Sequence, residues 1–265
     1  MTPKQVILYD IYNGGHKPQS TLECLEPVMD VLSIFKPKNV LEVGLGGAAW
    51  SILLARLQKD PSINFYGIDN FDLDSSVFKG RPDNINELIR LVDKQKMLYN
   101  IPNEFKIYDF DVTSQPLDKN GEPYSLLLSH FRNKDIKYDC IRLDCLCQDV
   151  KQIKSILYHC LEHTTDEFIL LIDDIGANEC VNRFIAAMEL VKEGKIKPLL
   201  FTPSEAAFTN IFFETSNLIN AFDLIEDKIY YETRPYIDFH YYGKHTPIIR
   251  TINCRKEISF KKSSK

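Results

Sequence analysis

The sequence predicts an α/β fold with one doubly wound, mostly parallel sheet. Short apolar runs alternate with longer amphipathic stretches along most of the chain, which is typical of β-then-α units. A late pair of apolar runs has too little chain between its members for a crossover helix. With 265 residues, 44% hydrophobic and 26% charged, and no Gly/Ser/Pro-rich linker near the middle, the chain favours one large core.

The expected strands are short and apolar, and they cover residues 39–43, 64–68, 105–108, 138–143 and 168–172. The last of these is a continuous apolar run suited to burial on both faces. The expected helices carry apolar residues at spacings of three and four, and they cover residues 21–36, 48–58, 83–99, 149–162 and 178–193. Two late strands, 199–202 and 209–214, should pair antiparallel and bring the sheet to seven strands.

Charge and composition narrow the function classes. The net charge is −5, and residues 250–265 carry six cationic side chains against Glu257, a net of +5, which leaves −10 for the rest. Such an acidic body disfavours nucleic-acid partners. No apolar run reaches the roughly 20 residues needed to span a membrane, and the N-terminus leads into no signal core. Seven cysteines, an odd count, favour reduced thiols, so we expect a cytoplasmic chain, with homo-oligomer formation left open.

A glycine-rich turn follows the first expected strand. Gly44 and Gly46 lack a Cβ where the chain must turn sharply and where a ligand can approach the backbone. The helix start beyond the turn offers free N–H groups. The spacing of Gly44, Gly46 and Ala49 also satisfies the dinucleotide-binding fingerprint, so an NAD(P)-dependent oxidoreductase is one interpretation.

Two carboxylates flank this turn. Asp69 precedes Asn70 at the end of the second strand, where a carboxylate can accept both hydroxyls of a ribose. Glu42 lies within the first strand, where a buried acid is costly unless it meets hydrogen-bond donors or a cation. A cationic ligand would supply them.

Four motifs in order carry a resemblance: 41-LEVGLGG-47, 67-GID-69, 109-DFDV-112 and 138-YDCIRLD-144. Together with the late strand pair, they resemble the class I S-adenosylmethionine-dependent methyltransferases. The resemblance covers about residues 38–215 and implies a Rossmann-like methyltransferase sheet with a terminal antiparallel hairpin. It divides the chain into an N-terminal helical or lid segment (1–37), the cofactor-binding core (38–215) and a C-terminal extension with a basic tail (216–265).

The resemblance also implies cofactor contacts. Glu42 would hold the amino end of S-adenosylmethionine through the turn region, and Gly44 and Gly46 would let the cofactor lie against the backbone. Asp69, with Asn70 beside it, would bind the ribose. The adenine would lie near Asp111, with Asp109 as the alternative.

Three carboxylates follow two neighbouring inner strands: Asp144 after one, Asp173 and Asp174 after the next. They resemble the Mg²⁺ ligands of metal-dependent O-methyltransferases of the catechol and sugar types, in which the metal would hold the acceptor oxygens. The alternatives are that Asp144 binds the cofactor and that these acids cap the helices that follow. Arg142 could pair with one of them or face a polar side of the crevice. The general bases of those relatives do not carry over, because Leu146 and Cys147 stand at their positions.

The acceptor is harder to predict. Residues 12–20 and the aromatic segment 234–245 are candidates to cover the crevice, and the latter is equally typical of a half-buried edge strand. His240 and His245 within it are candidate bases, and we carry Asp144 and His245 as the catalytic candidates. The sequence thus predicts a methyltransferase acting on a hydroxyl of a small molecule, a sugar or natural-product precursor first. The alternatives are the oxidoreductase and a non-catalytic methyltransferase-like partner subunit.

Overall fold

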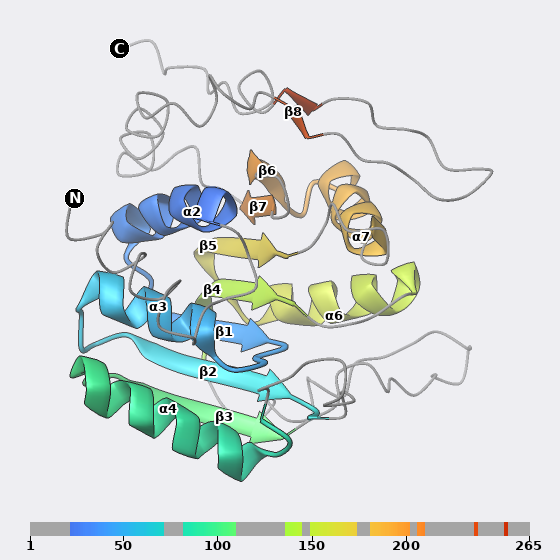
Figure 1. Ribbon diagram of the computed structural model, residues 1–265. Coiled ribbons are helices and arrows are strands. Elements are labelled where there is room, and N and C mark those ends of the chain that lie inside the picture. Colours follow the sequence, from blue (N-terminus) through green and yellow to red (C-terminus); the bar gives the residue numbers. More distant parts are fainter. Residues whose placement is uncertain are drawn as a thin grey trace, which may run out of the picture.

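The chain is organised around one central sheet (Figure 1). The computed structural model describes residues 22–71, 82–109, 136–144, 149–173, 181–201, 206–209, 236–237 and 252–253. Among these residues, no helix is long and apolar enough to cross a membrane.

Five strands form the parallel part of the sheet: β1 (Asn39–Val43), β2 (Asn64–Asp69), β3 (Glu104–Asp109), β4 (Tyr138–Leu143) and β5 (Thr164–Ile172). They lie in the order β3-β2-β1-β4-β5, and each neighbouring pair is parallel. The chain therefore winds outward from β1 in both directions. This arrangement confirms the predicted Rossmann-like α/β fold.

The helices are α2 (Leu22–Phe35), α3 (Ala49–Gln58), α4 (Ile85–Tyr99), α6 (Val150–Glu162) and α7 (Val181–Lys192). Crossovers between parallel strands are right-handed, so winding in opposite directions from β1 places the helices on opposite faces. In agreement with this rule, α3 packs beside α2 and α4, whereas α6 packs beside α7 (Figure 1). Helix α2 begins and ends within one residue of its predicted range.

Two further strands extend the sheet beyond β5. β7 (Ala206–Thr209) pairs antiparallel with β5, and β6 (Lys197–Phe201) pairs antiparallel with β7. The sequence placed the second of these strands at residues 209–214, and residues 210–214 lie outside the described part of the chain. Near the C-terminus, β8 (Tyr236–Ile237) pairs with β9 (Ile252–Asn253).

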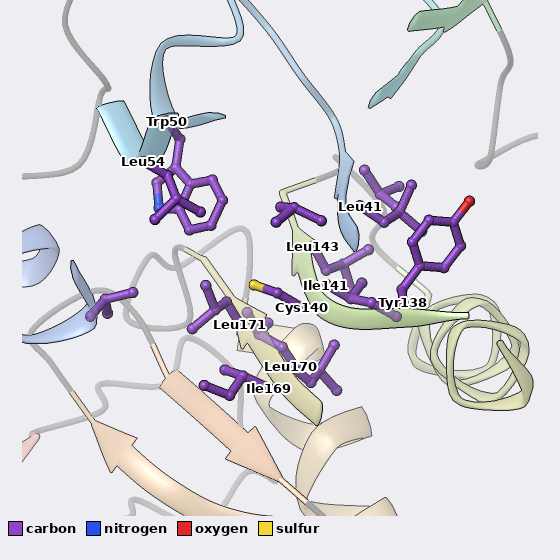
Figure 2. Packing of buried hydrophobic residues seen from close by; sticks show 14 of the residues in the cluster. Leu41, Trp50, Leu54, Tyr138, Cys140, Ile141, Leu143, Ile169, Leu170 and Leu171 are labelled. Atoms are coloured by element: carbon purple, nitrogen blue, oxygen red, sulfur yellow. The ribbon is translucent and has the colours of Figure 1, made fainter. Parts of the chain in front are cut away.

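The core lies between the sheet and its helices. Every residue from Phe168 to Ile172 is buried, as the continuous apolar run predicted. Figure 2 shows the core side chains of β4 and β5, including Ile141 and Leu170, together with Leu41 of β1 and Trp50 of α3. Trp50 is 2% exposed and packs in the core behind the glycine turn. The core fixes the strand ends that carry the polar residues.

Candidate functional site

The strand order reverses between β1 and β4, because the chain continues from β1 to β2 on one side and reaches β4 on the other. In doubly wound sheets, ligands bind in the crevice outside the carboxyl ends of the strands at such a reversal. Here that crevice begins at Gly44 after β1 and at Asp144 after β4. Backbone bonds hold its floor together: the Asp144 N–H donates to the Val43 carbonyl at 2.7 Å, and the Gly44 N–H donates to the Ile68 carbonyl at 2.8 Å.

The glycine turn has the backbone geometry for which glycine is needed. Gly44 has a φ of 85° and Gly46 a φ of 54°, both in the left-handed region that other residues rarely adopt. Ala48 also has a positive φ, 55°, and its N–H donates to the Leu45 carbonyl at 2.7 Å. These angles turn the chain from β1 directly into α3.

Helix α3 begins differently from the two helices whose caps can be compared with it. The Asn84 side chain accepts from the Glu87 N–H at the start of α4, and the Asp149 side chain accepts from the Lys151 and Gln152 N–H groups at the start of α6. No side chain caps α3 within the described residues, where Ala48 is the N-cap. The first N–H groups of α3 therefore point toward the crevice with their positive dipole end and no side-chain acceptor.

Asp69 lies at the carboxyl end of β2 and is 5% exposed. Its Oδ2 accepts from the Gly46 N–H at 2.8 Å, and its Oδ1 accepts from the Phe71 N–H at 3.0 Å. The carboxylate thus ties the glycine turn to the end of β2. These two backbone bonds fix the carboxylate beside the turn, where the sequence predicted a ribose-binding acid.

Leu45 fixes the same turn by packing. A Cβ added at Gly67 of β2 would lie 2.6 Å from the Leu45 Cγ, so the Leu45 side chain fills the place of a side chain at Gly67. Gly67 is the register partner of Glu42 on β1. The turn therefore folds down onto the surface of the sheet, held by Leu45 on one side and by Asp69 on the other.

Glu42 is buried beneath the turn, at 1% exposure. Its register partner on β4 is Arg142, and the Arg142 guanidinium contacts the Glu42 Oε1 at 2.7 Å. The Ser51 hydroxyl of α3 donates to the other oxygen, Oε2. Burial raises the pKa of Glu42 above its usual value, against the opposing charge and hydrogen bond of Arg142 and the bond from Ser51. At this burial, Glu42 acts on its surroundings through Ser51 at the start of α3 and through Arg142.

Arg142 connects β1 with the ends of β4 and β5. Its guanidinium contacts Asp173 and lies 3.2 Å from the Asp144 carboxylate. Arg183, in the first turn of α7, donates to the Asp173 carbonyl at 2.8 Å and lies 3.4 Å from the other oxygen of Asp144. We call these five side chains, Glu42, Arg142, Asp144, Asp173 and Arg183, the charge cluster.

The sequence left the pairing of Arg142 open, and the structure shows its guanidinium against Asp144 and Asp173, one of the alternatives, and against Glu42 as well. Sequence reasoning missed Ser51 and Arg183. Arg183 carried a usable signal, because it shares a helical face with Ala187 and Leu190, and all three are buried. A charge on an apolar face needs a partner within the core.

Two further predicted site residues, Asn70 and Asp109, lie at the carboxyl ends of β2 and β3. Asn70 is partly exposed next to Asp69, and Asp109, at the exposed end of β3, is the register partner of Asp69. Asp111, Asp174, His240 and His245 lie outside the described residues. Their proposed roles stay predictions.

The two predicted metal ligands that the structure describes, Asp144 and Asp173, do not fit a divalent cation in this arrangement. Asp144 and Asp173 each contact arginine, so the positions next to their oxygens hold guanidinium groups. Within the described ranges, there is also no group of three His, Cys, Asp or Glu side chains arranged to hold a metal. We derive no chemistry through Mg²⁺.

Comparison with known proteins defines the fold. No family model matches the chain, and no curated protein does. Among solved structures, the chain is similar to a candidate caffeoyl-CoA O-methyltransferase from Staphylococcus aureus, with a TM-score of 0.52 and 14% identity over 79% of this chain and 93% of the other.

Two more structures are similar at a TM-score of 0.49 each. One is an O-methyltransferase from Bacillus cereus in complex with S-adenosylhomocysteine, at 11% identity over 79% of this chain and 91% of the other. The other is the TDP-rhamnose 3'-O-methyltransferase of calicheamicin biosynthesis, at 14% identity over 77% and 91%. The chain has the fold of the class I S-adenosylmethionine-dependent O-methyltransferases, as its ordered motifs indicated.

Proposed function

We propose that this chain is an S-adenosylmethionine-dependent methyltransferase that acts on a hydroxyl of a small molecule. The observation that carries the proposal is the position of the glycine turn. It lies at the reversal of strand order in a methyltransferase fold, next to an α3 start that no described side chain caps and tied to Asp69.

The residues at the turn fit a sulfonium nucleoside. Gly44 and Gly46 place no side chain between the backbone and a ligand, and Asp69 is held next to them by the Gly46 and Phe71 N–H groups, in position for the ribose. The N–H groups at the start of α3 suit the carboxylate of the methionine part. Asn70 and Asp109, with Asp111 further along the chain, are the proposed neighbours of the adenosine.

The reaction is a direct displacement. When bound, S-adenosylmethionine supplies a methyl carbon on a positively charged sulfur. The acceptor oxygen forms a bond to that carbon, the carbon–sulfur bond breaks with its electron pair going to sulfur, and the hydroxyl proton passes to a base. The task of this chain is to bind and orient the acceptor and to exclude water.

The acceptor side of the crevice is proposed to begin at Asp144. Its side chain is 27% exposed, in contrast with the 4% of Asp173, so it is the carboxylate of the charge cluster that a bound molecule can reach. We take a sugar or natural-product hydroxyl as the first acceptor to test. His245 remains the proposed base, and the strand pair β6 and β7 the proposed terminal hairpin of the methyltransferase sheet.

Calorimetry tests the proposal. The chain should bind S-adenosylmethionine and S-adenosylhomocysteine with dissociation constants on the order of micromolar, and Asp69→Ala should weaken both at least about tenfold. NAD is the control, because the same glycine spacing is found in nicotinamide enzymes. Heat on adding NAD, with none on adding either sulfur nucleoside, would replace the methyltransferase by the oxidoreductase.

A further inference from the structure

The charge cluster gathers at the carboxyl ends of three neighbouring strands. Its three carboxylates, Glu42, Asp144 and Asp173, come from β1, the end of β4 and the end of β5. Arg142 contacts all three, and Arg183 contacts Asp144 from α7. The two guanidinium groups therefore join every acid of the cluster.

Most of the cluster is shielded from water. The side chains of Arg142 and Arg183 are 6% and 1% exposed, and those of Glu42 and Asp173 are 1% and 4% exposed. Three carboxylates this close would repel one another strongly without positive charge among them. Two arginines reduce the formal charge of the cluster to −1, and the planar guanidinium forks distribute their donors over several acceptor oxygens.

A divalent cation would have to compete for these same oxygens. Mg²⁺ and Mn²⁺ bind carboxylate oxygens and water in a tight octahedral shell. To take Asp144 and Asp173 as ligands, such an ion would have to displace the guanidinium of Arg142, and a displaced arginine has little water to reach at 6% exposure. The cluster is thus built around arginine.

We propose that Arg142 and Arg183 take the place of the divalent cation in this crevice, and that they hold Asp144 as a fixed anionic edge for the acceptor. With no metal to chelate, the acceptor does not need two neighbouring oxygens. A single hydroxyl that donates to the exposed part of Asp144 is enough to orient it. The inference rests on the proposed function for the nature of the acceptor, whereas the arginine-for-metal exchange can be tested without any methyl donor.

The test uses Mn²⁺ as the probe, followed by loss of the free-ion electron paramagnetic resonance signal. The purified wild-type chain should bind no Mn²⁺ at Asp144 with a dissociation constant below about 1 mM. Two variants each remove one guanidinium from the Asp144 carboxylate. The first is Arg183→Met, and the second combines Arg142→Met with Glu42→Gln, so that its net charge is unchanged. Both variants should bind Mn²⁺ at least about tenfold more tightly than the wild type.

Adding Asp144→Asn to either arginine variant is the matched control, and it should abolish the new binding. Thermal unfolding of each variant, with and without Mn²⁺, shows which of them fold and whether the ion stabilises them. Wild-type binding of Mn²⁺ in the micromolar range that Asp144→Asn removes would overturn the proposal, and that comparison needs neither arginine variant to fold. Folded arginine variants that bind Mn²⁺ no better than the wild type would overturn it as well.

Failure of this inference and failure of the proposed function give different results. A chain that binds Mn²⁺ through Asp144 and also binds S-adenosylmethionine would be a metal-dependent methyltransferase. A chain with the predicted Mn²⁺ behaviour and no affinity for sulfur nucleosides would keep the arginine exchange and lose the methyl-transfer reaction.

Discussion

The two halves of the crevice solve the problem of polar groups at strand ends in opposite ways. On the β1–β2 side, the glycine turn presents backbone N–H groups, and the Asp69 carboxylate ties it to the end of β2. On the β4–β5 side, the charge cluster pairs its own acids with its own arginines. The turn side presents backbone donors toward the crevice, whereas on the cluster side Asp144 is the most exposed of the five charged side chains.

A set of carboxylates at strand ends therefore does not by itself define a metal site. The same acids in a sequence can pair with a cation or with an arginine, and here Arg142, the register partner of Glu42, contacts Asp144 and Asp173. Opposite charges at paired positions of neighbouring strands form an ion pair that needs no ligand to neutralise it. Substitutions in the charge cluster should therefore cost more stability than substitutions at the glycine turn.

Arg142→Met should have the largest effect on stability. It leaves Glu42 and Asp173 buried without the cation that contacts both, and the loss of one partner from a buried pair typically costs about 3–5 kcal/mol. Urea denaturation measures the free energy of unfolding. Adding Glu42→Gln should recover part of the loss, and strictly additive effects of the two changes would contradict the pairing.

Asp69→Asn should weaken the turn side by a smaller amount. Asparagine offers one acceptor oxygen, so either the Gly46 or the Phe71 N–H loses its charge-assisted bond, at about 1.5–3 kcal/mol. The same variant should bind S-adenosylhomocysteine more weakly, because the turn and the ribose share this carboxylate. Stability and affinity both equal to the wild type would show that Asp69 does not hold the turn.

Gly67→Ala probes the packing of the turn. The new Cβ would collide with the Leu45 side chain, so Leu45 and the turn must shift, at a cost of about 1–3 kcal/mol. Affinity for S-adenosylhomocysteine should fall with stability. The double variant with Leu45→Ala removes the collision and should regain stability relative to Gly67→Ala; further loss would refute the steric explanation.

His163→Gln should have the smallest effect and only at acidic pH. Burial lowers the pKa of His163 below its usual value of 6.5, with the charge of Lys137 acting in the same direction. The unfolded chain then takes up a proton before the folded chain does, so stability present above pH 6.5 is lost as the pH falls through the lowered pKa.

The His163→Gln variant should lack this part of the pH dependence. Urea denaturation at about pH 7.5 and about pH 5.5 compares the two chains. The His163 carbonyl accepts from the N–H of Tyr138 at the start of β4. This histidine therefore lies at the amino ends of the strands, opposite the crevice. If the free energy of unfolding of the variant changes with pH as much as that of the wild type, the pH dependence belongs to other groups.

Much of the fold could be predicted because each strand and helix carries its own local signal. The apolar run Phe168–Ile172 predicted a strand buried on both faces, and the glycines at 44 and 46 predicted the turn that ends β1. The predicted ends of some strands differ from the observed ends by a few residues. β5 begins four residues before its apolar run because Thr164 to Glu167 form a polar, partly exposed start that the hydrophobic pattern does not mark.

The site was harder to predict because it depends on contacts between distant segments. Arg142 and Glu42 are 100 positions apart and meet only through the register of β1 with β4. Arg183 reaches Asp144 only after α7 is placed against the strand ends. The sequence motifs placed the acids in order and left a pairing with Arg142 as an alternative, but they did not indicate Arg183, so only the structure could weigh the metal interpretation against the two arginines.

The central claim is that a sulfonium nucleoside lies against the glycine turn with its ribose on Asp69. A crystal structure of the chain grown with S-adenosylhomocysteine tests it most directly. We predict that the ribose hydroxyls lie within hydrogen-bond distance of the Asp69 carboxylate and that the nucleoside packs along Gly44 and Gly46. A nucleoside bound elsewhere, or a turn that stays closed by Leu45 at saturating S-adenosylhomocysteine, would contradict it.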